Sequence, residues 1–182
     1  MLLIDALGRK KRILTRIVRG KSLPQYVYRW DTRSPDVIKI AGFQPRAIDG
    51  DLSVIEHVNN ALGSHRSNPE MNAKEYSQFV STGSYGMLST IDPVFAQQVL
   101  HTNLYKIDTT MIGCSSDFFD VNDVFDRAGL RRPYKEQREW AKINGIPRLA
   151  IIEVMTGREF MSQYDFKNGA PKEKDLKGRK TI

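Results

Sequence analysis

Alternating apolar and polar positions predict several short strands along this chain. At 26–31, Tyr26, Tyr28 and Trp30 alternate with Val27, Arg29 and Asp31, and these residue types favour strands. Period-two runs of this kind place alternate side chains on opposite faces of a sheet. Further strands are predicted at 79–82, 104–108, 149–155 and 159–164, with a hairpin turn at 156–158 joining the last two.

Helical periodicity and helix-start signals predict short helices between these strands. Asp92 followed by Pro93 is a specific helix start, because an N-cap carboxylate precedes a proline at the first helical position. Apolar residues at helical spacing predict further helices. These helices lie at 1–21, 36–41, 53–62 and 92–100, and polar loops are expected at 63–75 and 126–137. The mixture indicates an α+β fold.

The length and charge of the chain predict one domain with basic ends. The 182 residues carry a net charge of +7, and residues 9–21 alone hold seven lysines and arginines and no acid. We expect an amphipathic basic arm at 1–21, a domain at 22–167, and a basic, flexible tail at 168–182. The middle of the chain is close to neutral, so only the two ends would grip a polyanion. The alternative for the arm is a solvated amphipathic helix packed on the domain.

Cysteine and hydropathy patterns exclude several classes. Cys114 is the single cysteine, so the chain forms no internal disulfide and no cysteine-based zinc site. No apolar run approaches the ~18 residues of a membrane helix, and we expect no stable membrane insertion. The N-terminus places its apolar residues before its basic ones, the reverse of a secretory signal.

Two short segments carry candidate binding chemistry. Period two places Arg29, Asp31 and Arg33 on one face of a strand, where an arginine fork oriented by the aspartate could hold a phosphate. The alternative is a surface ion pair. The hydroxyls of Ser81 and Thr82, at the end of a strand, could donate to a carboxylate or a ribose, and the alternative is a simple turn.

A third segment places an amide two residues before a carboxylate. Gln137 and Glu139 would share one face of an extended loop that precedes the turn at 145–147. The alternative is a charged helix start, since glutamate favours the first helical turn.

The order of these segments resembles a known family, the bacterial mono-ADP-ribosyltransferase toxins of the cholera toxin group. This group includes heat-labile enterotoxin and the pertussis toxin catalytic subunit, and the CARDS toxin is also similar. The resemblance covers about residues 26–165. It rests on Tyr-Arg-x-Asp-x-Arg-x-Pro at 28–35, Gly-Phe at 42–43, Glu-His at 56–57, Phe-Val-Ser-Thr at 79–82, the segment 119–124, and Gln-Arg-Glu at 137–139 before Pro147.

The resemblance implies a fold, a reaction and a set of site residues. The fold would be ADP-ribosyltransferase-like, with two packed antiparallel or mixed sheets around an NAD cleft and short flanking helices. The reaction would transfer ADP-ribose from NAD, as substrate, and release nicotinamide without a metal. Glu139, Gln137 and Ser81 would be catalytic. Arg29, Asp31, Thr82 and His57 would bind NAD, with His57 near the adenosine-side ribose or the phosphates, while Trp140 and Arg33 would recognise the acceptor.

Gln137 departs from the enterotoxins, which have glutamate there and modify arginine. An amide cannot accept the proton of a guanidinium, so arginine is not the expected acceptor. Pertussis toxin and guanine-modifying members of the wider group carry glutamine. A protein side chain is the expected acceptor, with a nucleic-acid base or NAD hydrolysis as the alternatives. The resemblance also implies a toxin or secreted virulence effector, delivered to act in the cytosol of a target cell, and a cognate inhibitor protein as a further partner.

Overall fold

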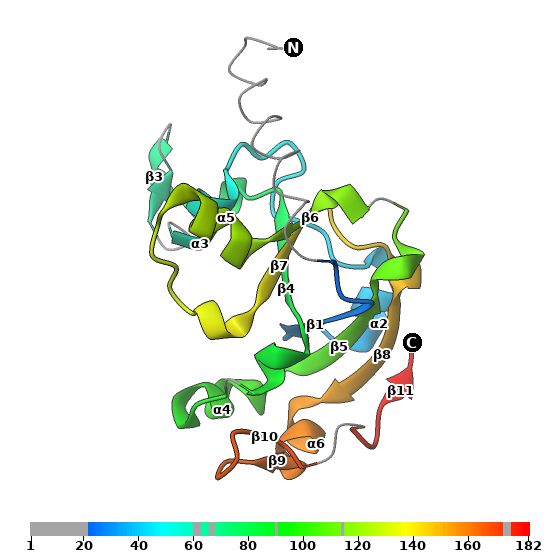
Figure 1. The fold of residues 1–182 in the computed structure, drawn as a ribbon. Coiled ribbons are helices and arrows are strands. Elements are labelled where there is room, and N and C mark those ends of the chain that lie inside the picture. Colours follow the sequence, from blue (N-terminus) through cyan, green and yellow to red (C-terminus); the bar gives the residue numbers. More distant parts are fainter. Residues whose placement is uncertain (1–21, 60–62, 66–67, 90, 114, 173–175) are drawn as a thin grey trace.

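The chain folds around a seven-stranded antiparallel sheet (Figure 1). The computed structural model describes residues 22–59, 63–65, 68–89, 91–113, 115–172 and 176–182. The strand order is β11 (Lys180–Thr181), β8 (Ile151–Thr156), β5 (Asn103–Asp108), β1 (Tyr26–Asp31), β4 (Phe79–Gly83), β7 (Glu139–Ile143) and β6 (Phe118–Asp120). Two-stranded sheets pair β2 (Ser64–His65) with β3 (Asn68–Asn72), and β9 (Tyr164–Asp165) with β10 (Ala170–Pro171).

The large sheet is nearly split between β1 and β4. β1 pairs with β5 along its whole length, whereas β1 and β4 are in register only at Tyr28 and Gly83. β4 then pairs with β7 along five residue pairs. The sheet therefore consists of two well-paired halves joined at a narrow junction. The expected α+β class is confirmed, but these strands form one continuous sheet where two packed sheets were expected. Arg29, Ser81 and Glu139 come from the three strands at this junction.

Short helices cover the two halves separately. α3 (Val54–Asn59) and α5 (Val121–Ala128) pack together against β4 and β7, and α4 (Pro93–Val99) and α6 (Gly157–Ser162) pack beside β1 and β5 (Figure 1). α2 (Pro35–Ala41) follows β1. The 3-10 helices are η1 (Ala73–Tyr76), η2 (Tyr85–Ser89), η3 (Thr109–Met111), η4 (Ser115–Asp117), η5 (Lys135–Gln137) and η6 (Arg148–Ala150).

The clearest error of the sequence prediction concerns the segment after β8. A strand was expected at 159–164, joined by a hairpin turn at 156–158, but the chain forms helix α6 there. Thr156 and Glu159 form a capping box, in which each side chain accepts from the other residue's backbone N–H. This four-residue pattern satisfies the first turn of a helix and outweighs the local strand preference.

Three segments predicted as loop or flexible tail contain regular structure. The loop predicted at 63–75 contains the hairpin β2–β3 and η1, and α5 and η5 occupy parts of the loop predicted at 126–137. The tail, predicted to be flexible, adds β10 and β11, and β11 pairs with β8 at the sheet edge (Figure 1). The helix predicted at 1–21 lies outside the described residues. Within the described ranges, no helix is long and apolar enough to cross a membrane.

Candidate active site

A cleft of about 340 Å³ opens at the junction between the two halves of the sheet. Its lining comes from β1, β4, η2, α4, η5 and the start of β7. A second hollow of about 680 Å³ adjoins it and shares Phe95 and Gln137. The cleft is lined by Tyr28, Arg29, Trp30, Ser81, Thr82, Met87, Phe95, Gln137 and Glu139, so the polar groups of three predicted segments converge among aromatic and apolar side chains.

Arg29 is fixed in this cleft by two acceptors. Its Nε donates to Asp31 Oδ2 at 3.1 Å, and its Nη1 donates to the backbone oxygen of Ser81 at 2.7 Å. Burial lowers the pKa of Arg29, and the carboxylates of Asp31 and Glu139 oppose that shift. An arginine held in this way presents its remaining N–H groups in a fixed direction, which suits a planar bidentate contact with phosphate.

Asp31 binds two arginines, Arg29 on β1 and Arg33 just after the strand. It is 8% exposed, and besides Arg29 it accepts from the Nε and Nη2 of Arg33, at 2.8 and 2.7 Å. Burial alone would raise the pKa of Asp31, but hydrogen bonds from the Arg33 side chain and backbone, and the charges of Arg29 and Arg33, lower it to about 2. Asp31 is therefore a buried anion that orients Arg29 toward the cleft.

Glu139 is the carboxylate at the centre of the site. His57 Nε2 lies 3.7 Å from its Oε1, and Arg132 Nη2 donates to its Oε2 at 3.0 Å. Burial raises its pKa, but hydrogen bonding by His57 and Ser81 and the positive charge of Arg132 bring the pKa below the usual value. The carboxylate is accordingly ionised near neutral pH, which is the state that stabilises a cationic transition state.

His57 lies behind this carboxylate. Its Nε2 is 2.9 Å from Ser81 Oγ, and its Nδ1 is 2.7 Å from Ser77 Oγ. Both ring nitrogens are thus used within the protein. The family resemblance assigned His57 to NAD binding, and that contact stays a prediction. In the structure His57 supports Ser81 and Glu139, because α3 packs on the face of β4 that carries Ser81.

The loop before β7 has a constrained backbone. Tyr134 and Arg138 both have positive φ, at 56° and 46°, and η5 lies between them. Gln137 is exposed at the end of this turn and lines the cleft with Glu139. The two residues therefore face one cavity, as their spacing predicted, although a tight turn rather than an extended loop brings them there.

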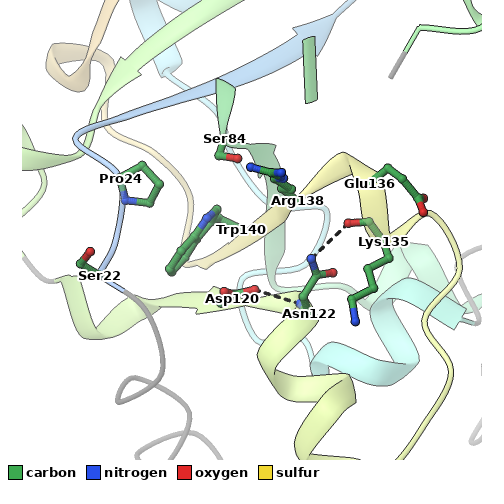
Figure 2. Close-up of a pocket in the computed structure, with 9 residues that line it drawn as sticks. All are labelled: Ser22, Pro24, Ser84, Asp120, Asn122, Lys135, Glu136, Arg138 and Trp140. Atoms are coloured by element: carbon green, nitrogen blue, oxygen red, sulfur yellow. Dashed lines mark hydrogen bonds between the residues drawn. The ribbon is translucent and has the colours of Figure 1, made fainter. Parts of the chain in front are cut away.

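A separate hollow of about 490 Å³ lies on the other side of this loop (Figure 2). The ring of Trp140 forms one wall, and Pro24, Asp120 and Arg138 lie around it (Figure 2). Trp140 follows Glu139 on β7 and so projects from the opposite face of the strand. The structure thus places Trp140 away from the cleft that Glu139 lines.

Two other predicted residues, Thr82 and Arg33, make contacts within the protein next to the site. Thr82 Oγ1 donates to the Trp140 backbone oxygen at 2.8 Å, which ties β4 to β7 next to Glu139. Arg33 lies over the Phe43 ring and is bound to Asp31, while its side chain stays 40% exposed, so its role in acceptor recognition stays a prediction.

Sequence reasoning missed several residues that shape the site. Trp30, Met87 and Phe95 supply the apolar lining of the cleft, and Arg132 reaches Glu139 from a loop without any periodic pattern. Strand alternation places Trp30 on the opposite face from Arg29, so all four of these residues reach the site through tertiary packing. No cluster of His, Cys, Asp and Glu suited to a metal occurs among the described residues.

Comparison with known proteins identifies the family. A family model described as Scabin-like matches residues 27–168. The chain belongs to the Scabin-like family. A search of curated protein sequences gave no match.

Solved structures agree with this fold. The Scabin toxin from Streptomyces scabies in complex with NADH is 23% identical, with 87% of this chain and 78% of that chain covered and a TM-score of 0.52. A single-residue variant of the same toxin is 24% identical, with 86% and 77% covered and a TM-score of 0.51.

Family membership confirms the main expectations from the sequence. The chain is a transferase of the bacterial ADP-ribosyltransferase toxins, NAD-dependent, with NAD as its substrate. The finer assignment to the cholera and pertussis toxin group stays a prediction, as does secretion.

Proposed function

We propose that this enzyme transfers ADP-ribose from NAD to an exocyclic amino group of a nucleic-acid base, with guanine as the first base to test. The observation that carries the proposal is the pairing of a neutral amide, Gln137, with the ionised Glu139 in one cleft. The sequence alone favoured a protein acceptor, so the choice of acceptor here rests on the geometry around the loop at 134–138.

The first step breaks the bond between the nicotinamide nitrogen and the ribose carbon. The electron pair leaves with nicotinamide, and the sugar becomes an oxocarbenium ion. Glu139 stabilises this cation and accepts a hydrogen bond from a ribose hydroxyl, while Arg29 holds a phosphate of NAD. Removing one preorganised group of this kind costs about 10²–10³ in rate.

The second step forms a bond from the acceptor nitrogen to the same carbon, and the nitrogen loses its proton to solvent. A base amine is neutral near pH 7, so it needs no carboxylate to remove a proton before attack. An amide instead offers one donor and one acceptor, which can pair with the polar edge of a base. Gln137 suits this task, and it suits a protonated guanidinium poorly.

The hollow beside the loop supports a nucleic-acid acceptor. Trp140 borders this hollow with the small part of its side chain that is open, since the residue is 7% exposed. Among the described residues the guanidinium of Arg138 donates no hydrogen bond, so it is available to a phosphate (Figure 2). Another hollow, of about 850 Å³, adjoins the Trp140 hollow of about 490 Å³ and shares Pro24, Ser84, Glu136 and Arg138 with it. Three tyrosines line this larger hollow: Tyr26, Tyr28 and Tyr85. Stacking surfaces around an available cation are typical of single-strand binding sites.

The test is a transfer assay with labelled NAD and single-stranded oligonucleotides. We expect label on a strand with one guanine in a thymine background and none on the all-thymine strand, because thymine has no exocyclic amine. Mass spectrometry would locate the modified base. Arg138→Gln should weaken transfer to the strand and reduce the salt slope of its binding by about one, whereas the exposed control Arg131→Gln should not.

A protein acceptor is the competing outcome. Label on proteins of a cell lysate, with none on any oligonucleotide, would overturn the proposed acceptor and leave the enzyme class intact. Equal label on the all-thymine strand would equally contradict an amine acceptor.

A further inference from the structure

Arg132 is a buried cation in a loop whose neighbouring residues are exposed. Its side chain is 2% exposed, although Arg131 and Pro133 on either side lie at the surface. Taking a guanidinium out of water is costly unless its charge is paired and its N–H groups find acceptors. The partners of Arg132 therefore indicate why this side chain is held inside.

The first partner is the carboxylate at the centre of the cleft. Arg132 Nη2 donates to Glu139 Oε2 at 3.0 Å. This contact uses one acceptor direction of the carboxylate, and an ionised carboxylate has about four. Glu139 thus keeps acceptor capacity for a substrate hydroxyl while Arg132 holds it.

The remaining partners connect the guanidinium to the catalytic loop. Arg132 Nη1 donates to Asn122 Oδ1 and, at 3.3 Å, to the Tyr134 backbone oxygen. Asn122 in turn donates from Nδ2 to the Lys135 backbone oxygen at 3.1 Å (Figure 2). One side chain therefore links the start of α5, the turn that ends at Gln137, and the carboxylate of Glu139.

We propose that Arg132 is a positioning residue, which fixes the direction of the Glu139 carboxylate and keeps it ionised through the contact at Oε2. Glu139 also faces His57 from α3 and Ser81 from β4, and the charge of Glu139 acts on Arg29 from β1. Of these groups Arg132 is a permanent cation in direct contact with the carboxylate. Its removal leaves a buried anion with one fewer partner, and burial then favours the protonated acid.

The inference rests on the catalytic role of Glu139 in the proposed function, so the assay measures nicotinamide release without any acceptor. This readout does not depend on whether the acceptor is a base or a protein. The variants are Arg132→Met, Arg132→Lys and the matched control Arg131→Met, whose side chain is exposed. Glu139→Gln is measured first, because full activity in that variant would reject the site itself.

We expect Arg132→Met to lower kcat by about 100-fold, because a misdirected Glu139 carboxylate is displaced from the reacting carbon. We also expect the acid limb of its pH profile, followed from about pH 4 to about pH 8, to move to higher pH. Arg132→Lys should return the limb toward that of the wild type, since an ammonium restores the charge, while kcat stays lower because lysine lacks the planar fork. Arg131→Met should match the wild type in both respects.

Two results would overturn the proposal. One is an Arg132→Met profile that coincides with that of Arg131→Met. The other is a lower kcat with an unshifted acid limb in the folded protein, which would assign Arg132 a structural role alone. If Arg132→Met does not fold, Arg132→Gln decides instead, because glutamine keeps polar contacts but removes the charge, and an unshifted acid limb in that variant would overturn the proposal. Asn122→Ala removes a partner of Arg132 but keeps both charges, so it should lower kcat and leave the limb in place.

Discussion

Replacing Asp31 by asparagine tests how strongly the buried anion on β1 stabilises the fold. Asp31 is 8% exposed and is bound by both Arg29 and Arg33. These arginines lower its pKa from 3.8 to about 2. A shift of one in pKa corresponds to 1.36 kcal/mol, so the ionised form contributes about 2 kcal/mol to the free energy of unfolding.

The pH dependence follows from the direction of this shift. A carboxyl whose pKa is lower in the folded protein stabilises it fully above the unfolded value of 3.8, and this stabilisation is lost as the pH falls toward about 2. Asparagine carries no charge at any pH. The difference between wild type and Asp31→Asn should therefore be about 2 kcal/mol near neutral pH and shrink steadily at acid pH.

Urea unfolding at a series of pH values measures this difference. Asp36→Asn is the control, because Asp36 is an exposed acid at the start of α2, and its replacement should change the free energy of unfolding by less than about 0.5 kcal/mol. A difference for Asp31→Asn that stays constant down to about pH 2 would refute the reasoning, since its origin would then not be ionisation. The same variant should raise KM for NAD, because Arg29 loses the acceptor at its Nε.

Two further substitutions test what stabilises the fold, one a close backbone contact of α6 and the other a hydrogen bond between β4 and β7. Gly157→Ala should lower the free energy of unfolding by more than about 3 kcal/mol, because the added Cβ would lie 1.7 Å from the Val99 backbone oxygen. Gly113→Ala is its control, since a Cβ there meets no described atom within 4 Å, and thermal unfolding compares the two. Thr82→Val should cost about 1 kcal/mol in urea unfolding through loss of the bond to the Trp140 backbone oxygen. A Thr82→Val protein as stable as the wild type would contradict that assignment.

Strand periodicity made β1 and its polar face predictable. Arg29, Asp31 and Arg33 were placed on one face because a strand alternates, and the structure joins them through Asp31. The same rule places Trp140 on the opposite face of β7 from Glu139, and its assignment to acceptor recognition stays a prediction. Where local periodicity decides side-chain direction, the sequence was therefore sufficient.

The contacts of His57 and Arg132 were not predictable in the same way. His57 is directed by the packing of α3 on β4, and Arg132 by a loop that turns back toward β7. The helical pattern at 53–62 predicted a helix around His57 but not the strand on which that helix packs, and the loop that carries Arg132 has no periodic pattern. α6 was missed for a different reason, because the capping pattern at Thr156 and Glu159 was present in the sequence but was overlooked in favour of a hairpin turn.

The positive φ at Arg138 allows the catalytic loop to serve two surfaces. Gln137 and Glu139 line the cleft, whereas Arg138 and Trp140 line the adjoining hollow. Gly86 permits this arrangement, since a Cβ there would lie 2.7 Å from the Arg138 side chain. Substitutions at Arg138 can therefore change the affinity for an acceptor while the groups that act on NAD keep their contacts. Gln137, by contrast, lies beside Glu139 in the cleft, so only the Arg138 side of the loop is separate from the groups that act on NAD. Acceptor affinity and nicotinamide release should therefore vary independently across variants of Arg138.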